Sequence, residues 1–210
     1  MDECDEARSI LEARGEGERE KIFAEVFTRH RNRLRTMVDF RLDPLLRARV
    51  DPSDVLQEAY LEAAQRLPKY VESPGLPLFL WLRSIAGQTL ARLQRFHLGA
   101  DRRDPRREVS FLGTPATTAR MLVDALVGRD PSPSAAVRFA EMKERLEEAL
   151  DRMDEKDREI VALRHFEELS SAEAARVLEI EEEAARKRYF RALEKLKKVL
   201  GAMPGGLEGI

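Results

Sequence analysis

Cysteine and histidine are scarce in this 210-residue sequence, and apolar runs are short. Cys4 is the single cysteine, which excludes a disulfide framework and a cysteine-based zinc site. The three histidines, at positions 30, 97 and 165, form no helical pair that could hold a metal. No apolar run approaches the length of a membrane span, and the N-terminus is acidic, unlike a signal peptide. We therefore expect a soluble, cytoplasmic chain with no cofactor, no metal and no membrane contact.

The patterns of common catalytic sites are also missing. The sequence contains no glycine-rich phosphate loop and no serine nucleophile motif. Its carboxylates fall on the expected outer faces of helices rather than in paired pockets. We therefore expect that the protein is not an enzyme.

Apolar residues recur at helical spacing along most of the chain, and β-branched residues do not alternate over a usable length, which predicts an all-α fold. The expected helices cover residues 19–42, 52–67, 78–96, 171–178 and 182–200. Four prolines interrupt the pattern between residues 99 and 134 and predict a flexible linker. The linker would join two small helical domains, at 19–98 and 135–200. An acidic, disordered segment at 1–18 and a tail at 201–210 complete the expected organisation.

The net charge of −2 conceals two basic segments. Residues 83–107 contain seven arginines, and residues 186–198 contain seven basic side chains against one acidic one. Two separate basic segments in a nearly neutral chain indicate two surfaces that face anions, and nucleic acid is the commonest such partner. Two solvated helix faces are the alternative.

The C-terminal segment has the pattern of a helix-turn-helix. Ser170 or Ser171 is expected to cap a short helix, and a tight turn through Glu179 leads into a longer, basic one. In such a motif the second helix enters the major groove of DNA. The residues expected on its outer side are Arg186, Lys187, Phe190 and Arg191, with Arg188 at the flank. An antiparallel helix pair with a basic solvent face is the alternative.

The helix expected over residues 52–67 has a clear start and an acidic outer face. Asp51 is placed to cap it, and Pro52 suits its first position. The outer face includes Asp54, Gln57, Glu58 and Leu61. An apolar residue surrounded by acids suits docking on a basic protein helix, although a solvated acidic face is the commoner arrangement.

The helix expected over residues 78–96 places aromatic side chains among basic and polar ones. Stacking platforms with nearby phosphate contacts are what single-stranded or melted nucleic acid requires, although each aromatic residue alone would fit a core. The candidates are Tyr70, Trp81, Arg83, Gln88, Arg92 and Arg95.

Three motifs, taken together, resemble the extracytoplasmic-function sigma factors, the minimal two-domain class of the sigma-70 family of bacterial RNA polymerase subunits. They are DPSDVLQEAYLEAAQRL, FLWLRSIAGQTLARLQR and the segment from MDEKDREIVALRHF to KLKKVL, in this order. The resemblance implies a sigma-2-like helical bundle and a sigma-4-like helix-turn-helix domain. It also implies promoter recognition, melting of the −10 element and transcription initiation without catalysis by the chain itself.

The resemblance assigns roles to the candidate residues. Asp54, Gln57, Glu58 and Leu61 would dock on the clamp helices of the largest subunit of core RNA polymerase. Tyr70, Trp81, Arg83, Gln88, Arg92 and Arg95 would contact the −10 element of promoter DNA. Arg164 would contact the DNA backbone at the −35 element, where Arg186, Lys187, Arg188, Phe190 and Arg191 would form the recognition surface. An anti-sigma factor or a regulatory kinase is a further possible partner.

The sequence departs from the family pattern in the turn and at the start of the last helix. Glu179 stands where the family usually carries glycine, and Glu181–Glu183 stand where DNA phosphates should approach. These acids predict either weakened −35 binding or a different contact with the groove. Two other functions stay open: a stand-alone helix-turn-helix regulator of transcription, and a helical adaptor that binds no DNA.

Overall fold

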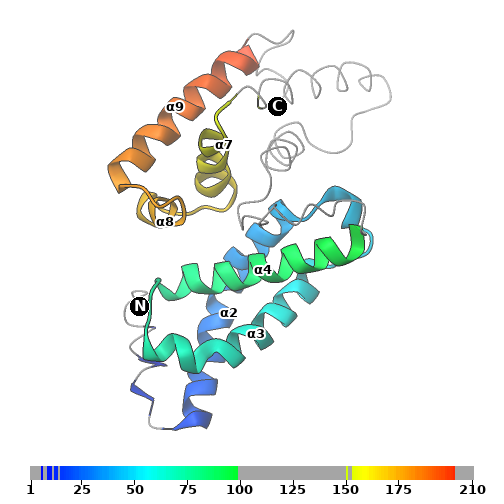
Figure 1. The fold of residues 1–210 in the computed structure, drawn as a ribbon, viewed down its shortest axis with the longest axis vertical. Helices are drawn as coiled ribbons and strands as arrows, with labels where there is room; N and C mark the ends of the chain where they lie inside the picture. Colours follow the sequence, from blue (N-terminus) through cyan, green and yellow to red (C-terminus); the bar gives the residue numbers. More distant parts are fainter. Residues whose placement is uncertain are drawn as a thin grey trace. The chain divides into compact units, whose positions relative to one another are not determined.

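The computed structural model describes residues 15–98 and 153–201, Leu150, and five residues before Gly15, namely Glu6, Ser9, Ile10, Glu12 and Ala13. Every regular element in these residues is helical, which confirms the expected all-α class (Figure 1). The chain divides into two compact units, residues 1–111 and 112–210. The whole linker expected at 99–134, and all of the tail expected at 201–210 except Gly201, lie outside the described residues. In the part of the chain described, no helix is long and apolar enough to cross a membrane.

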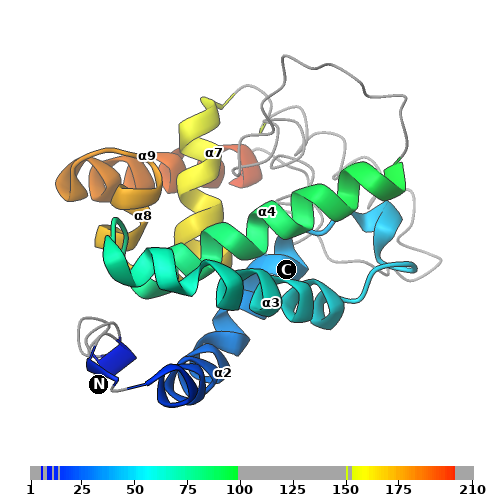
Figure 2. The same ribbon diagram turned by 60° about the horizontal axis from the view of Figure 1, so that its bottom comes forward.

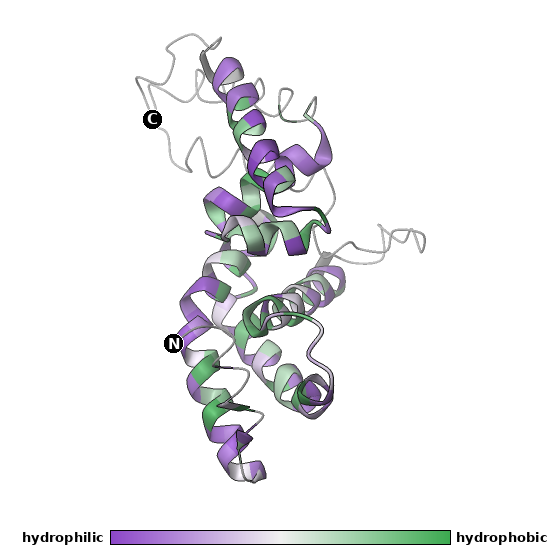
Figure 3. Cartoon of the chain, turned by 90° about the vertical axis from the view of Figure 1, so that its left-hand side faces the viewer, coloured by the Kyte–Doolittle hydropathy of each residue, from purple (hydrophilic) through white to green (hydrophobic). Residues whose placement is uncertain are grey.

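The first unit is built on three long helices. They are α2 (Glu16–Arg41), α3 (Pro52–Glu72) and α4 (Leu78–Leu98), with a short 3-10 turn, η1 (Pro44–Leu46), after α2. Each of the three packs on the other two, and Figure 2 shows α4 lying along α3. The contact faces bury large apolar side chains, among them Phe23, Leu34, Leu56, Leu82 and Ile85. Hydrophobic and hydrophilic residues alternate along the helices (Figure 3), as expected when one face packs and the other meets water.

The start of α3 agrees with the prediction from the sequence, but its end does not. Asp51 caps the helix by accepting a 2.7 Å hydrogen bond from the backbone N–H of Ser53, and this bond lowers the pKa of Asp51. We expected the helix to stop before Pro68, and this was wrong, because α3 continues to Glu72 with Pro68 inside it. A proline inside a helix removes a backbone hydrogen bond. Burial of Leu67 and Tyr70 on either side of it offsets that loss.

Two residues of the acidic N-terminal segment are packed rather than disordered. Ile10 is 1% exposed and Glu6 is 3% exposed. The carboxylate of Glu6 lies 2.7 Å from Nη1 of Arg29 and 2.7 Å from Nε2 of His30, both on α2. The expectation of disorder over residues 1–18 is therefore corrected for Ile10, which is buried, for Glu6, whose carboxylate is paired with α2, and for residues 16–18, which belong to α2.

The second unit contains the helix-turn-helix. Its elements are α7 (Glu155–Val161), a π-helical turn η3 (Ala162–Phe166), α8 (Ser171–Val177) and α9 (Glu182–Gly201), and α9 packs on both α7 and α8. Ser170 caps α8 in a capping box: its Oγ accepts from the N–H of Glu173, whose carboxylate accepts from the N–H of Ser170. Small buried residues, Ala174, Ala185 and Ala192, let α8 and α9 approach closely. The helices expected at 171–178 and 182–200 are confirmed to within one residue.

The turn between α8 and α9 contains a backbone conformation that favours glycine. Glu179 has φ of 53°, in the left-handed region. The next residue, Ile180, donates its N–H to the carbonyl of Ala175 at 3.0 Å and closes the end of α8. Glu179, the position that departs from the family pattern, is thus one at which the backbone has a positive φ.

Candidate nucleic-acid and protein interfaces

The outer side of α9 is basic and carries one large apolar side chain. Arg186 and Lys187 are exposed, and Phe190 is 60% exposed. The opposite side of the helix, with Ala185 and Ala192, is buried against α7 and α8. The structure therefore places Arg186, Lys187 and Phe190 together on a face that DNA could reach.

A second group of basic side chains on α9 faces α7. Nη2 of Arg191 lies 3.0 Å from Oδ1 of Asp157, and Nζ of Lys195 lies 2.6 Å from Oδ2 of the same carboxylate. Arg188 pairs with Asp154 at 3.3 Å and lies 3.7 Å from Asp157. Asp157 itself has no exposed side-chain surface. We call Asp157 with Arg188, Arg191 and Lys195 the α7–α9 charge cluster.

This cluster changes the expected position of Arg191. The sequence grouped Arg191 with Arg186 and Lys187 on one outward sector. At 100° per residue, five positions turn Arg191 by about 140° from Arg186, toward the side of Arg188. Its side chain is 57% exposed and is tied to α7 through Asp157. Arg191 therefore lies at the edge of the basic face rather than in its middle.

The charges around Asp157 decide its protonation. Burial acts to raise the pKa of Asp157, but hydrogen bonds from Lys195 and Arg191 outweigh burial, so that the pKa lies below its ordinary value of 3.8. Asp157 is therefore ionised at neutral pH, and the cluster holds a carboxylate with three cations.

Arg164 holds η3 against its neighbours. Its guanidinium lies 5.3 Å from the centre of the Tyr189 ring on α9, and its Nη1 donates a hydrogen bond to the carbonyl of Leu169. The side chain is half-buried. A contact of Arg164 with the DNA backbone stays a prediction.

The three acids at the start of α9 all face solvent. Glu181, Glu182 and Glu183 are exposed, and Oε1 of Glu183 lies 2.8 Å from Nζ of Lys187. A negative side chain is favourable at a helix N-terminus. The carboxylate of Glu183 also pairs with Lys187, one of the cations expected to contact DNA.

On the first unit, the expected docking residues share one exposed face of α3. Asp54, Gln57 and Glu58 are exposed, and Leu61 is 61% exposed. Glu58 pairs with Arg92 of α4 at 3.2 Å, and Arg92 also lies 3.3 Å from Glu62. The sequence did not predict this link between the acidic face of α3 and an arginine assigned to the −10 element.

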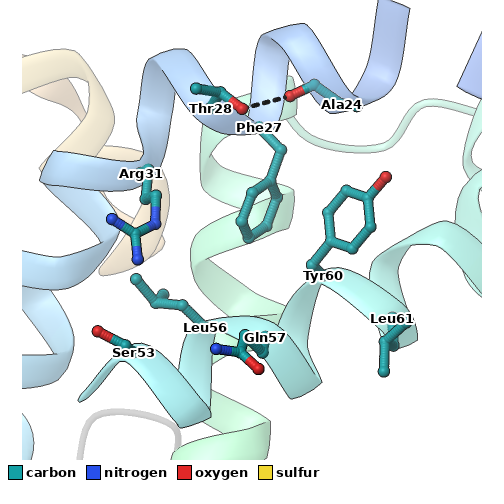
Figure 4. A pocket seen from close by; sticks show the side chains of 9 residues that line it. All are labelled: Ala24, Phe27, Thr28, Arg31, Ser53, Leu56, Gln57, Tyr60 and Leu61. Carbon is teal, nitrogen blue, oxygen red and sulfur yellow. Dashed lines mark hydrogen bonds between the residues drawn. The ribbon is translucent and has the colours of Figure 1, made fainter. Parts of the chain in front are cut away.

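A pocket of about 400 Å³ lies between α2 and α3 beside this face. The rings of Phe27 and Tyr60 meet edge to face in it, with centres 5.0 Å apart (Figure 4). Gln57 and Leu61 belong both to the pocket wall and to the expected docking residues. Nothing in the sequence indicated the pocket, since its shape depends on how α2 and α3 pack against each other.

The residues expected at the −10 element divide between surface and core. Trp81, half-buried, stacks on Tyr70 with ring centres 4.4 Å apart and 26° between planes. Gln88, Arg92 and Arg95 are exposed.

Tyr70 and Arg83 do not lie on that surface. Tyr70 is 6% exposed and donates its hydroxyl to the carbonyl of Leu76 at 2.9 Å, and Arg83 is 1% exposed. The expectation that Arg83 faces DNA is corrected, because helical spacing from the buried Phe79 and Ala86 places it on the core face. In the residues described, no group of histidine, cysteine or acidic side chains is arranged to hold a metal ion.

Part of the chain matches a protein-family model, and its fold resembles that of a solved structure. Residues 143–196 match the family model described as sigma-70, region 4. Among solved structures, one match is the "Structure of CnrH in complex with the cytosolic domain of CnrY", with a TM-score of 0.51 and 21% sequence identity over 97% of this chain and 99% of that chain. No curated protein matches the sequence.

Proposed function

We propose that this chain, whose resemblance to the extracytoplasmic-function sigma factors is confirmed by its region 4 and its fold, binds core RNA polymerase and directs it to promoters. The chain would supply no catalysis of its own. In this role the second unit binds the −35 element and the first unit docks on polymerase and opens the −10 element. The chain would meet core RNA polymerase and promoter DNA in the cytoplasm.

The observation that carries the proposal is the exposed basic face of α9 within a capped helix-turn-helix. Arg186, Lys187 and Phe190 lie on the side opposite to the packed alanines. A helix of this kind can enter the major groove, where arginine and lysine bind guanine edges and phosphates. The same segment matches sigma-70 region 4.

Docking on polymerase is supported by the face of α3. Leu61, more than half exposed, is surrounded by exposed polar and acidic side chains, including Asp54 and Glu58. A solvent-exposed leucine among acids is a good centre for contact with a basic helix, since apolar burial gives affinity and charge gives orientation. The clamp helices of the largest polymerase subunit are the proposed partner.

Opening of the −10 element is supported by the surface of α4. Trp81 offers a half-buried ring held flat against Tyr70, and Arg92 and Arg95 are exposed about one and two helical turns from Gln88. An unpaired base can stack on an aromatic ring while arginines bind its phosphates.

The test combines binding and transcription. The full chain is incubated with core RNA polymerase of the source organism and passed over an affinity column. The resulting complex is then used for run-off transcription across the organism's genomic DNA. We expect stoichiometric retention with core polymerase and discrete transcription starts that are absent with core enzyme alone. Retention without new starts would contradict promoter recognition.

A stand-alone helix-turn-helix regulator is the second candidate function. It would use the basic face of α9 but would have no use for an exposed Leu61 among acids. DNA binding by the chain without retention on core polymerase would favour this candidate.

Control of the chain by another protein is a further part of the proposal. The solved structure that resembles this fold pairs CnrH with the cytosolic domain of CnrY. We propose that a protein inhibitor, an anti-sigma factor, binds this chain and holds it inactive. A regulatory kinase is an additional proposed partner.

A further inference from the structure

We propose that Asp157 is a positioning residue for −35 recognition: it holds the guanidinium of Arg191 at the edge of the DNA-facing surface and offsets part of the positive charge that Lys195 offers to DNA phosphates. The inference rests on the proposed function, since it assumes that α9 binds DNA. It concerns a residue on α7, outside the helix-turn-helix itself.

The geometry of the α7–α9 charge cluster carries the first step. Oδ1 of Asp157 binds Arg191 and Oδ2 binds Lys195, so that each oxygen orients a different side chain of α9. The carboxylate has no exposed surface, whereas the side chains of Arg191 and Lys195 are 57% and 44% exposed. Asp157 therefore binds Arg191 and Lys195 on their protein-facing sides and leaves their solvent-facing sides accessible.

Asp157 lies in the capped first turn of α7, which fixes the position of its backbone. Asp154 caps α7 by accepting a 3.0 Å hydrogen bond from the N–H of Lys156, and the N–H of Asp157 donates to the carbonyl of Asp154 at 2.9 Å. Long basic side chains lose conformational entropy when they bind. A guanidinium that is already hydrogen-bonded on one side has fewer orientations to lose, so it discriminates better between base edges.

The charge of Asp157 has the opposite effect on binding without sequence preference. Phosphate binding grows with the number of cations that reach the DNA backbone. Asp157 engages two of them directly and lies 3.7 Å from a third, Arg188. The carboxylate therefore lowers the affinity for any DNA while it raises the preference for the matched site. A residue that only supports packing would change both in the same direction.

The experiment measures a ratio of affinities. Wild-type chain in complex with core polymerase selects from a duplex library that is randomised upstream of a fixed −10 element. Affinities are then measured for the enriched −35 sequence and for a scrambled one. For Asp157→Asn we expect the ratio to fall by about tenfold, as for loss of one oriented arginine–base contact. We also expect tighter binding to the scrambled duplex, with a log–log salt slope steeper by about 0.9 for each additional phosphate that the variant neutralises.

Control variants separate positioning from packing and from charge. Glu155→Gln removes an exposed acid from the same helix and should leave the ratio unchanged. Arg191→Lys keeps the charge but loses the two-armed donor, so it should lower the ratio as much as Asp157→Asn does. The double variant Asp157→Asn with Arg191→Lys should lower it no further. Lys195→Met leaves Asp157 and Arg191 in place and should keep the ratio at least at the wild-type value.

The possible outcomes separate this inference from the function on which it rests. If wild type enriches a −35 sequence and Asp157→Asn keeps the full ratio, Asp157 does not position Arg191. An equal loss of affinity for the matched and the scrambled duplex would assign Asp157 a packing role only and overturn the inference. Retention on core polymerase without enrichment of any −35 sequence would overturn −35 reading itself. If Asp157→Asn does not fold, an unchanged ratio in Arg191→Lys would overturn the inference.

Discussion

Lys195 on α9 donates a 2.6 Å hydrogen bond to Oδ2 of Asp157, a carboxylate on α7 with no exposed surface. Arg191 binds the other oxygen of the same carboxylate at 3.0 Å. The helix expected to bind DNA is thus joined to the helix before the helix-turn-helix by charge as well as by apolar packing. This connection gives the second unit a testable dependence on pH.

Acid should remove the stabilisation that Asp157 provides. Its pKa in the folded chain lies below the ordinary 3.8, so the unfolded chain binds more protons than the folded chain between the two pKa values. Stability contributed by the ionised carboxylate is complete above about pH 5 and is lost as the pH falls through the folded pKa. In thermal melts of the full chain, followed by circular dichroism, the melting temperature of wild type should be higher than that of Asp157→Asn at pH 7. That difference should shrink below about pH 4, and a constant difference would contradict the prediction.

Glycine at position 179 should stabilise the second unit. Glu179 adopts φ of 53°, a conformation that costs a residue with a β-carbon about 1 kcal/mol relative to glycine. Glu179→Gly should therefore raise the free energy of unfolding by about 1 kcal/mol in urea titration. Glu179→Ala removes the same charge but keeps the β-carbon and should give no such increase. Equal increases in the two variants would assign the effect to charge.

Much of the second unit was predictable because its signals are local. The capping box at Ser170 and the alternation of buried alanines with basic residues lie within a few positions of one another, and the structure confirms the two helices. The residues whose surroundings the sequence did not predict depend on distant packing. Tyr70 stays helical beyond Pro68 through its burial in the bundle, and Arg191 is drawn to Asp157, which is 34 positions away.

Arg83 shows a different limit. Its position on the core face could be read from its spacing to Phe79 and Ala86, but an arginine is rarely buried, so its residue type favoured the surface. The structure places it in the core at 1% exposure. The pocket beside Leu61 could not be predicted, because its shape depends on how α2 and α3 pack.

Charge reversal on α3 should abolish binding to core polymerase. Asp54 and Glu58 are exposed, so the double variant Asp54→Lys with Glu58→Lys should fold normally, since exposed charges contribute little to stability. The same change opposes a basic partner helix. In a pull-down, retention on core polymerase should be lost while the circular dichroism spectrum is unchanged. The matched control reverses two exposed acids of α2, Glu20→Lys with Glu25→Lys, and should bind normally. Normal binding by the α3 variant would remove the docking proposal.

Neutralising the start of α9 should tighten binding to −35 DNA. Glu181, Glu182 and Glu183 are exposed, and Glu183 holds Lys187 at 2.8 Å. Replacing the three by Ser, Gly and Thr removes repulsion of phosphates and frees Lys187 to bind them. We expect affinity of the complex with core polymerase for promoter duplex to rise several-fold at low salt.

The salt dependence and a control distinguish this effect from a general change in charge. The improvement should shrink as salt rises toward about 1 M, because the Debye length falls to about 3 Å and screens both the repulsion and the released cation. Glu194→Gln removes another exposed acid of α9, beyond its recognition residues, and should change affinity much less. Weaker binding after the triple replacement would mean that the acids contact DNA or polymerase directly. An equal improvement from Glu194→Gln would mean that net charge, rather than the position of the acids at the helix start, limits −35 binding.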